Sequence, residues 1–296
     1  MKRIARSIIK LMSPAIMAED DVSSVGVNQA NPENIFRQEN LVAWCIVPYD
    51  KLNRTPKQRI ALLKELNFTQ YAYDWRPEHL PSIAEELHLA AEENVRIAAV
   101  WMWIDDGYDA VGKLSANNQR LLDIVKASGQ KTKLWLGING NVFDGLDEVG
   151  KVRRGVEMVR YLRHHVPANV TEIGLYGHGD WFGEPENQIG ILETLNDPTL
   201  GLVYNFHHAH GQIKSFSALM QRMMPWLWTV NLNGMDTAGN KILPIGSGAD
   251  DLAMLKILKQ SGFSGSVGIL GHIEEEDVKL VLQRNLAGLR MLEANL

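Results

Sequence analysis

One alternation runs through most of this chain: short segments rich in β-branched and aromatic residues are followed by segments with helical character. The eight expected strands cover residues 41–48, 68–74, 95–104, 132–139, 172–177, 201–206, 227–232 and 266–271. Successive βα units form parallel sheets, and a nearly continuous apolar run is typical of a strand buried on both faces. The sequence therefore predicts an α/β protein with parallel strands.

The length of the repeating part decides between the two common parallel architectures. Residues 39–296 match the roughly 250 residues that an eightfold βα barrel takes. An open, doubly wound sheet is the rival, but no glycine-rich GxGxxG turn follows any of the expected strands. We predict a single (β/α)8 TIM barrel with a short, poorly ordered N-terminal extension.

Residues 1–38 are expected to form a leader or a linker rather than part of the barrel. Residues 1–18 have a basic start, an uncharged stretch and a small residue, Ala18, before an acidic segment. This is the outline of a secretory signal peptide, although Lys10 interrupts the apolar run. Two localisations stay open: periplasmic or secreted after cleavage, or cytoplasmic.

Composition excludes several classes of protein. The net charge of -5 disfavours a nucleic-acid binder, and the single cysteine, Cys45, excludes an internal disulfide framework. No apolar stretch reaches the roughly 20 residues of a membrane span. We expect a small-molecule partner, no nucleic acid and no membrane; a homo-oligomer is compatible with the sequence.

Two helix starts carry recognisable capping signals. Thr55 precedes Pro56, which suits the first helical position. Ser82 is followed three residues later by Glu85, the spacing of a capping box. Both positions are predicted to begin helices of the βα units.

If the eight strands close into a barrel, the residues that follow each strand meet at one rim, where active sites of this fold lie. Six of the nine histidines fall at expected strand ends: His79, His178, His207, His208, His210 and His272. The polar residues that we expect to bind a substrate there are Asp74, Arg76, Asn139, Tyr176, Asn205, His210, Asn231, Asn233 and His272.

Three tryptophans are expected near the mouth, namely Trp101, Trp103 and Trp181. Their flat faces suit the C–H face of a sugar, and the neighbouring amide, imidazole and carboxylate groups suit its hydroxyls. Trp44, Trp135, Trp226 and Trp228 are expected to fill the barrel core.

Five segments resemble a known superfamily: 174–187 (GLYGHGDWFGEPEN), 201–210 (GLVYNFHHAH), 230–235 (VNLNGM), 242–248 (ILPIGSG) and 266–272 (SVGILGH). They are similar to the xylose isomerase-like TIM barrels, the sugar phosphate isomerase/epimerase group that also includes endonuclease IV. The resemblance covers essentially residues 39–296. It implies a sugar-processing barrel.

The resemblance also implies a metal site, which this sequence alters. Sugar isomerases and epimerases of the superfamily commonly hold a divalent metal with Glu, Asp, His and Glu on strands five to eight. Motif by motif, these positions fall on Tyr176, Asn205, Asn231 and Leu270. A hard divalent ion requires several oxygen donors, some of them anionic. We therefore expect the usual Mg²⁺ or Mn²⁺ site to be absent.

The remaining polar groups leave several functions open. The first is a sugar isomerase or epimerase that moves protons with His208, Glu184 and His178 as catalytic residues. Alternatively, three of the histidines at 178, 208, 210 and 272 hold Zn²⁺ in a lyase or hydrolase acting on sugars. A carbohydrate-binding barrel without turnover is another reading. A nuclease similar to endonuclease IV is disfavoured by the net charge.

Overall fold

The computed structural model describes residues 34–296. The proposed leader 1–18, and the linker up to residue 33, lie outside the described residues. Ile35 and Phe36 are buried in the hydrophobic core, so the packed structure begins N-terminal to the expected start at residue 39. None of the helices formed by residues 34–296 combines the length and the apolar character that a membrane crossing requires.

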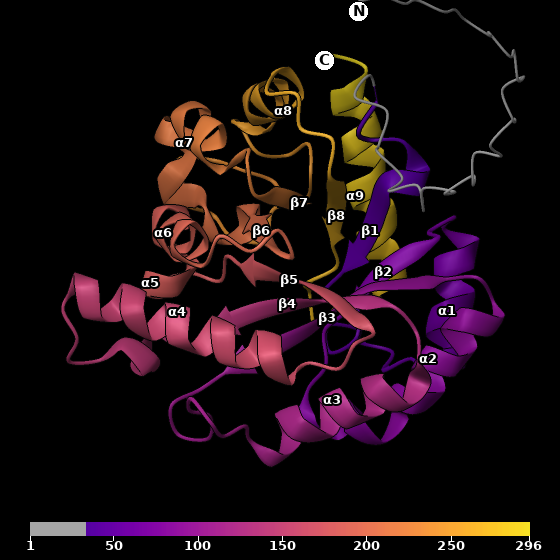
Figure 1. The fold of residues 1–296 in the computed structure, drawn as a ribbon. Coiled ribbons are helices and arrows are strands. Elements are labelled where there is room, and N and C mark those ends of the chain that lie inside the picture. Colours follow the sequence, from indigo (N-terminus) through magenta and orange to yellow (C-terminus); the bar gives the residue numbers. More distant parts are fainter. Residues whose placement is uncertain (1–33) are drawn as a thin grey trace, which may run out of the picture.

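Eight parallel strands form a closed barrel in the order β1 to β8, which confirms the predicted architecture (Figure 1). The strands are β1 Leu41–Trp44, β2 Gln70–Tyr73, β3 Arg96–Ile104, β4 Thr132–Ile138, β5 Val170–Tyr176, β6 Leu200–Asn205, β7 Leu227–Leu232 and β8 Ser266–Leu270. All eight lie within the predicted segments or begin up to two residues earlier. Strand β1 falls furthest short of its predicted segment, 41–48. It ends at Trp44 because Cys45 takes a left-handed backbone conformation (φ 55°).

Helices surround the strands and cover their outer faces (Figure 1). They are α1 Pro56–Glu65, α2 Ile83–Glu92, α3 Ala116–Ser128, α4 Glu148–His165, α5 Asp180–Gly183, α6 Pro185–Leu195, α7 Phe216–Met223, α8 Asp251–Gln260 and α9 Val278–Glu293. Four short 3₁₀ helices, Pro77–Ser82, Gly140–Phe143, Phe206–His208 and His210–Ser215, lie in loops that follow strands.

The two predicted caps have different outcomes. Thr55 caps α1 with a full capping box, since its side chain accepts from Gln58 N and Gln58 reaches back to Thr55 N. The capping box expected at Ser82 is wrong. The 3₁₀ helix Pro77–Ser82 runs directly into α2, so Ser82 has helical dihedral angles and its hydroxyl donates to His79 O instead.

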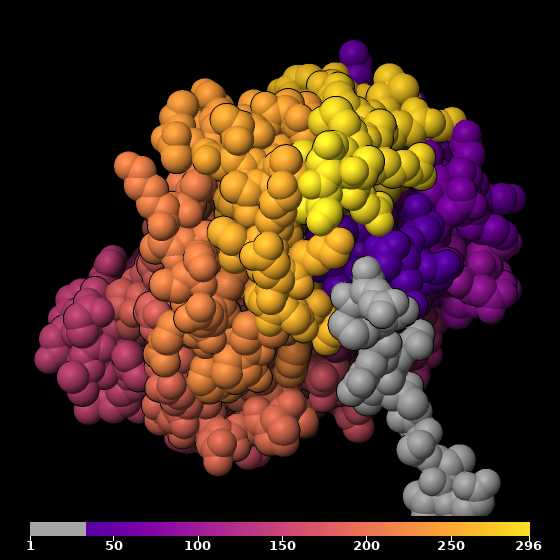
Figure 2. Space-filling view, turned by 90° about the horizontal axis from the view of Figure 1, so that it is seen from above, coloured from indigo at the N-terminus to yellow at the C-terminus, as the bar shows by residue number. Residues whose placement is uncertain are grey.

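The two ends of the barrel domain are joined by the closing strands and by polar contacts. β1 pairs with β8, and Asp50, after β1, accepts from Val278 N at the start of α9 at 3.3 Å. Arg54 also donates to both Asp50 and Asp277. Figure 2 shows the same closure from above, where the yellow C-terminal residues lie beside the indigo ones. The carboxyl ends of all strands therefore surround one mouth.

Aromatic side chains fill the inside of the barrel. Trp44, Trp135 and Tyr176 are 2% exposed, and the Trp44 ring meets the Trp135 ring edge-on at a centroid distance of 4.9 Å. Small residues, including Ala72 and Val203, occupy neighbouring positions in this cluster. The interior is thus a packed core, and the aromatic layer forms the floor beneath the mouth.

Candidate functional site

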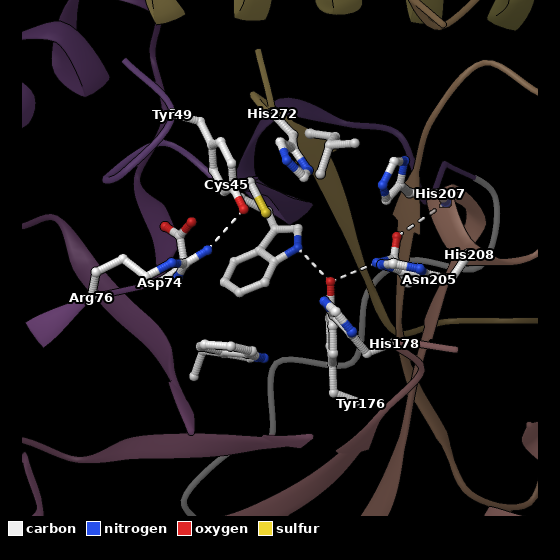
Figure 3. Close-up of a pocket in the computed structure, with 13 residues that line it drawn as sticks. Cys45, Tyr49, Asp74, Arg76, Tyr176, His178, Asn205, His207, His208 and His272 are labelled. Atoms are coloured by element: carbon white, nitrogen blue, oxygen red, sulfur yellow. Dashed lines mark hydrogen bonds between the residues drawn. The ribbon is translucent and has the colours of Figure 1, made fainter. Parts of the chain in front are cut away.

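A pocket opens at the carboxyl end of the barrel, where the sequence predicts the site (Figure 3). It contains about 330 Å³ of space not filled by atoms, part of it open to solvent. Its lining consists of Trp44, Cys45, Tyr49, Asp74, Arg76, Trp101, Tyr176, His178, Asn205, His207, His208, Leu270 and His272.

Asp74 is the only carboxylate in this lining, and it is 2% exposed. Its Oδ1 accepts from Ile46 N and Val47 N at 3.3 Å each, while its buried Oδ2 has no hydrogen-bond partner among the described residues. Burial raises the pKa of Asp74 to about 7, against the opposing effect of Arg76 and the Val47 N–H. A carboxyl group with this pKa exchanges its proton readily at neutral pH, as a general acid–base catalyst must.

Arg76 brings a positive charge to the same wall of the pocket. Its Nη1 donates to Trp75 O and its Nη2 to Tyr49 Oη, at 2.9 and 2.8 Å. Its guanidinium carbon lies 5.3 Å from the centroid of the Trp101 ring, within the range of cation–π attraction. Stacking and two hydrogen bonds thus hold this charge near Asp74.

A row of imidazoles forms the opposite wall. His178 follows β5, His207 and His208 follow β6, and His272 follows β8. Successive ring centroids lie 4.4 Å (His178–His208), 4.6 Å (His208–His207) and 5.2 Å (His207–His272) apart. Burial, together with repulsion from the neighbouring rings and Lys241, lowers the pKa of His207 to about 3 and of His208 to about 2.

His272 behaves in the same way, since burial and the nearby Arg76 and His178 lower its pKa to about 4. These three rings are therefore neutral at neutral pH, and each offers one N–H donor and one nitrogen acceptor. The buried Nδ1 of His207 has no partner among the described residues. Neutral imidazoles with unused hydrogen-bonding capacity suit a polyhydroxylated ligand.

Two of the predicted site residues lie away from the pocket. Glu184 precedes α6, is exposed, and accepts from Gln212 Nε2 at 2.7 Å beside a separate groove. Trp181, on α5, packs against Phe143 and donates to Glu148. The prediction placed both at the strand-five end, but the loop after His178 continues through α5 and carries them outward.

The predicted amides outside the pocket are engaged elsewhere or sit deeper in the barrel. Asn139 donates to Asp105 at 2.8 Å and accepts from Asn141 N in the 3₁₀ helix that it caps, so both ends of its amide have partners. Asn233 donates to Gly234 O. Asn231 is fully buried against Gly268, and neither of its amide atoms has a partner among residues 34–296.

Two further predicted residues border the lining. Trp103 stacks on Trp101 and meets the His178 ring edge-on at 4.8 Å, and it lies over Gly137, where a Cβ would come within 2.5 Å of its ring. His210 Nδ1 lies 3.2 Å from Asp236 O, which joins the loops after β6 and β7. Trp103 thus packs against two lining residues from outside the pocket.

The structure therefore brings together eight of the fifteen predicted site residues: Asp74, Arg76, Trp101, Tyr176, His178, Asn205, His208 and His272. Five further lining residues are not among the predicted site residues: Trp44, Cys45, Tyr49, His207 and Leu270. His207 is among the histidines expected at strand ends, and Tyr49 directly follows the expected first strand, although it lies five residues beyond the end of β1. Trp44 was assigned to the core, and it serves both the core and the pocket.

Comparison with known proteins rests on structure, since neither a family model nor a curated sequence matches the chain. Among the similar solved structures is a 3-keto-D-glucoside 4-epimerase from E. coli, 15% identical, with a TM-score of 0.61 over 86% of this chain and 99% of that one. A D-psicose 3-epimerase from Clostridium cellulolyticum H10, solved with D-tagatose, is 12% identical, with a TM-score of 0.61 over 86% and 98%.

A third similar structure is a xylose isomerase domain protein from Planctomyces limnophilus, 13% identical, with a TM-score of 0.58 over 87% of this chain and 98% of that one. The chain has the fold of the xylose isomerase-like TIM barrels. The predicted resemblance is thus confirmed for the fold. At these identities the match concerns architecture, and the chemistry of this xylose isomerase-like barrel depends on its own residues.

The four positions that the sequence resemblance assigns to metal ligands, Tyr176, Asn205, Asn231 and Leu270, carry side chains that do not fit a hard divalent ion. Leu270 has no donor atom, and the oxygen of Tyr176 already accepts hydrogen bonds from Trp44 and Asn205. Asn231 supplies only a neutral amide. A Mg²⁺ or Mn²⁺ site requires anionic oxygens that these side chains do not offer.

The zinc alternative has no preformed ligand set either. Among residues 34–296, no group of three or more His, Cys, Asp or Glu side chains is arranged to hold a metal ion. The imidazole rings of the pocket lie tilted or edge-on to one another.

Proposed function

We propose that the chain is a sugar isomerase/epimerase-like enzyme that transfers protons on a carbohydrate or sugar derivative, with Asp74 as the principal acid–base group. The observation that carries this proposal is the free, buried Oδ2 of Asp74 in the pocket. The hydrogen-bond partners of Asp74 occupy Oδ1, so Oδ2 is available for a substrate proton. The epimerases named above, which act on sugars with this fold, support the choice of substrate class.

The histidines retain a role in this proposal. His208 and His178, predicted as catalytic residues, line the pocket with Asp74 and are candidates to relay a proton or to bind substrate hydroxyls. His207 and His272 supply further neutral donors and acceptors. Glu184 is left out, since its carboxylate lies on another surface.

Deuterium exchange from solvent tests the proposal. The full chain is incubated in heavy water with a panel of aldoses, ketoses and keto-glycosides, and proton NMR follows the loss of carbon-bound hydrogen. We expect exchange on at least one sugar, reduced by about 100-fold or more in Asp74→Asn. Asp123→Asn, an exposed carboxylate on α3, is the control and should exchange like the wild type.

Two results would contradict the proposal. Equal exchange in the wild type and Asp74→Asn would remove Asp74 from the mechanism. Binding of panel sugars with no exchange in the wild type would favour the alternative function, a carbohydrate-binding barrel without turnover.

A further inference from the structure

The hydroxyl of Tyr176 has an unusual hydrogen-bonding position. Tyr176 ends β5 and is 2% exposed, with its oxygen beneath the pocket (Figure 3). Trp44 Nε1 donates to this oxygen at 2.9 Å, and Asn205 Nδ2 donates to it at 2.5 Å. A phenolic hydroxyl carries two acceptor lone pairs and one hydrogen. Both lone pairs are therefore in use, and only the hydrogen is left.

Neither neighbour can accept that hydrogen. The indole N–H of Trp44 is a donor only. The amide of Asn205 is fixed in orientation, because its Oδ1 accepts from His207 N at 3.2 Å where the chain enters the next 3₁₀ helix. Turning the amide over would place two N–H groups against His207 N–H. The amino group of Asn205 therefore faces Tyr176.

The hydrogen of Tyr176 also has no acceptor elsewhere in the described part of the chain, where the hydroxyl takes part only in the two bonds that it accepts. Buried polar groups are nearly always paired. Tyr176 lines the pocket, so its hydrogen is available to solvent or to a ligand that occupies the pocket. Burial raises the pKa of the phenol well above its usual value, and the hydrogen stays in place at neutral pH.

We propose that Tyr176 donates a hydrogen bond to an acceptor-only oxygen of the ligand, the carbonyl oxygen of a keto sugar. This inference rests on the proposed function and names its substrate class. Trp44 and Asn205 are positioning residues, since their donated bonds leave the phenol only one direction for its hydrogen.

The proton transfer then balances without a further reactant. The Asp74 carboxylate removes the hydrogen from the carbon next to the carbonyl. The C–H electron pair becomes the C=C bond, and the carbonyl π electrons move onto oxygen. Tyr176 stabilises the resulting enolate oxygen by its hydrogen bond, which strengthens as negative charge develops. Return of the proton to carbon restores the carbonyl, with inverted or original configuration.

The direction of the hydrogen can be observed without knowing the substrate. A neutron structure of the deuterated full chain locates the Tyr176 deuterium. We expect it to point into the pocket, bonded to solvent or to an added sugar. A deuterium shared with Asn205 Oδ1 or any other protein atom would overturn the proposal.

Activity provides the second test, with the sugar found by deuterium exchange as the probe. We expect Tyr176→Phe to lower the kcat for exchange by about 100-fold or more, with a smaller change in KM. Tyr204→Phe, which removes another buried, hydrogen-bonded phenol, is the matched control. Since Tyr176→Phe also deprives Trp44 and Asn205 of their acceptor, 3-fluorotyrosine at position 176 provides a second variant that keeps the oxygen and is a stronger donor.

The fluorinated protein should retain exchange. An unchanged kcat in Tyr176→Phe would overturn the proposal, as would loss of exchange in the 3-fluorotyrosine protein with its fold intact. Exchange in the wild type should also survive prolonged treatment with EDTA, and loss of exchange that Mg²⁺ or Zn²⁺ restores would overturn it too. The neutron result does not depend on turnover, so failure of the proposed function and failure of this inference can be told apart.

Discussion

Arg76 donates from Nη2 to the hydroxyl of Tyr49 at 2.8 Å, and in the described part of the chain no carboxylate forms an ion pair with this guanidinium. Its positive charge nevertheless acts on Asp74, whose pKa it lowers against the larger effect of burial. Arg76 thus holds the acid–base group within the neutral range.

Replacing Arg76 should therefore move the pH dependence of exchange. In Arg76→Gln the Asp74 carboxylate loses the charge that lowers its pKa most, so its pKa rises. The increase of the exchange rate with pH should then shift to more alkaline pH. The measurement is the exchange rate of one sugar between about pH 5 and pH 9.

Arg76→Lys serves as the comparison, because it keeps the charge and loses the fork of N–H groups. Its pH profile should stay closer to that of the wild type. An Arg76→Gln profile that coincides with the wild type would show that Arg76 does not tune Asp74.

Asp74 should also reduce the stability of the protein at neutral and alkaline pH. Its folded-state pKa of about 7 lies above its ordinary value of 3.8, so the folded protein binds the proton more tightly than the unfolded chain. The free energy of unfolding contributed by this group therefore falls as pH rises from about 4 to about 7, and then levels off. The difference corresponds to at most about 4 kcal/mol.

Asp74→Asn should remove this pH dependence while it removes activity. We expect the variant to be more stable than the wild type above pH ~7, and nearly equal to it near pH ~4. Urea unfolding at both pH values measures the difference. A variant less stable than the wild type at alkaline pH would indicate that Asp74 is a structural carboxylate.

His208 is expected to contribute to turnover as a neutral ring in contact with the ligand. His208→Ala should lower the exchange rate by about 100-fold and leave the far-UV circular dichroism spectrum unchanged. His88→Ala, on the exposed face of α2, is the control, since its side chain is 70% exposed. Exchange in His208→Ala at the wild-type rate would remove His208 from the site.

Gly268 provides a test of the barrel interior beneath the mouth. A Cβ at this position would lie 1.9 Å from Asn231 Oδ1, so Gly268→Ala should destabilise the protein by about 1–3 kcal/mol. The same substitution in an Asn231→Ala background should cost less, because the clashing amide is gone. Additive effects in this double-mutant cycle, measured by urea unfolding, would contradict the contact.

The strands could be predicted because burial on both faces imposes nearly continuous apolar runs, as in 132–139 and 227–232. The position of the site followed from the fold, since strand ends must meet in a closed barrel. This is why Asp74, His178, His208 and His272, distant in the chain, line one pocket.

The individual contacts could not be predicted, because loop paths decide them. Glu184 and Trp181 follow the same strand as His178, but the helix α5 turns the chain away from the mouth. The raised pKa of Asp74, about 7, results mainly from burial of its side chain, and no single residue in the sequence encodes that burial. The left-handed Cys45, which ends β1 early and points into the pocket lining, gives no sequence signal.

The most direct test of the account is the titration of Asp74 itself. Carbon NMR of the isotope-labelled wild type, assigned by comparison with Asp74→Asn, reports the pKa of this one carboxyl group. We expect a value of about 7. A value near the ordinary 3.8 would make the Asp74 carboxylate a much weaker base at neutral pH, and would contradict its proposed role as the principal acid–base group.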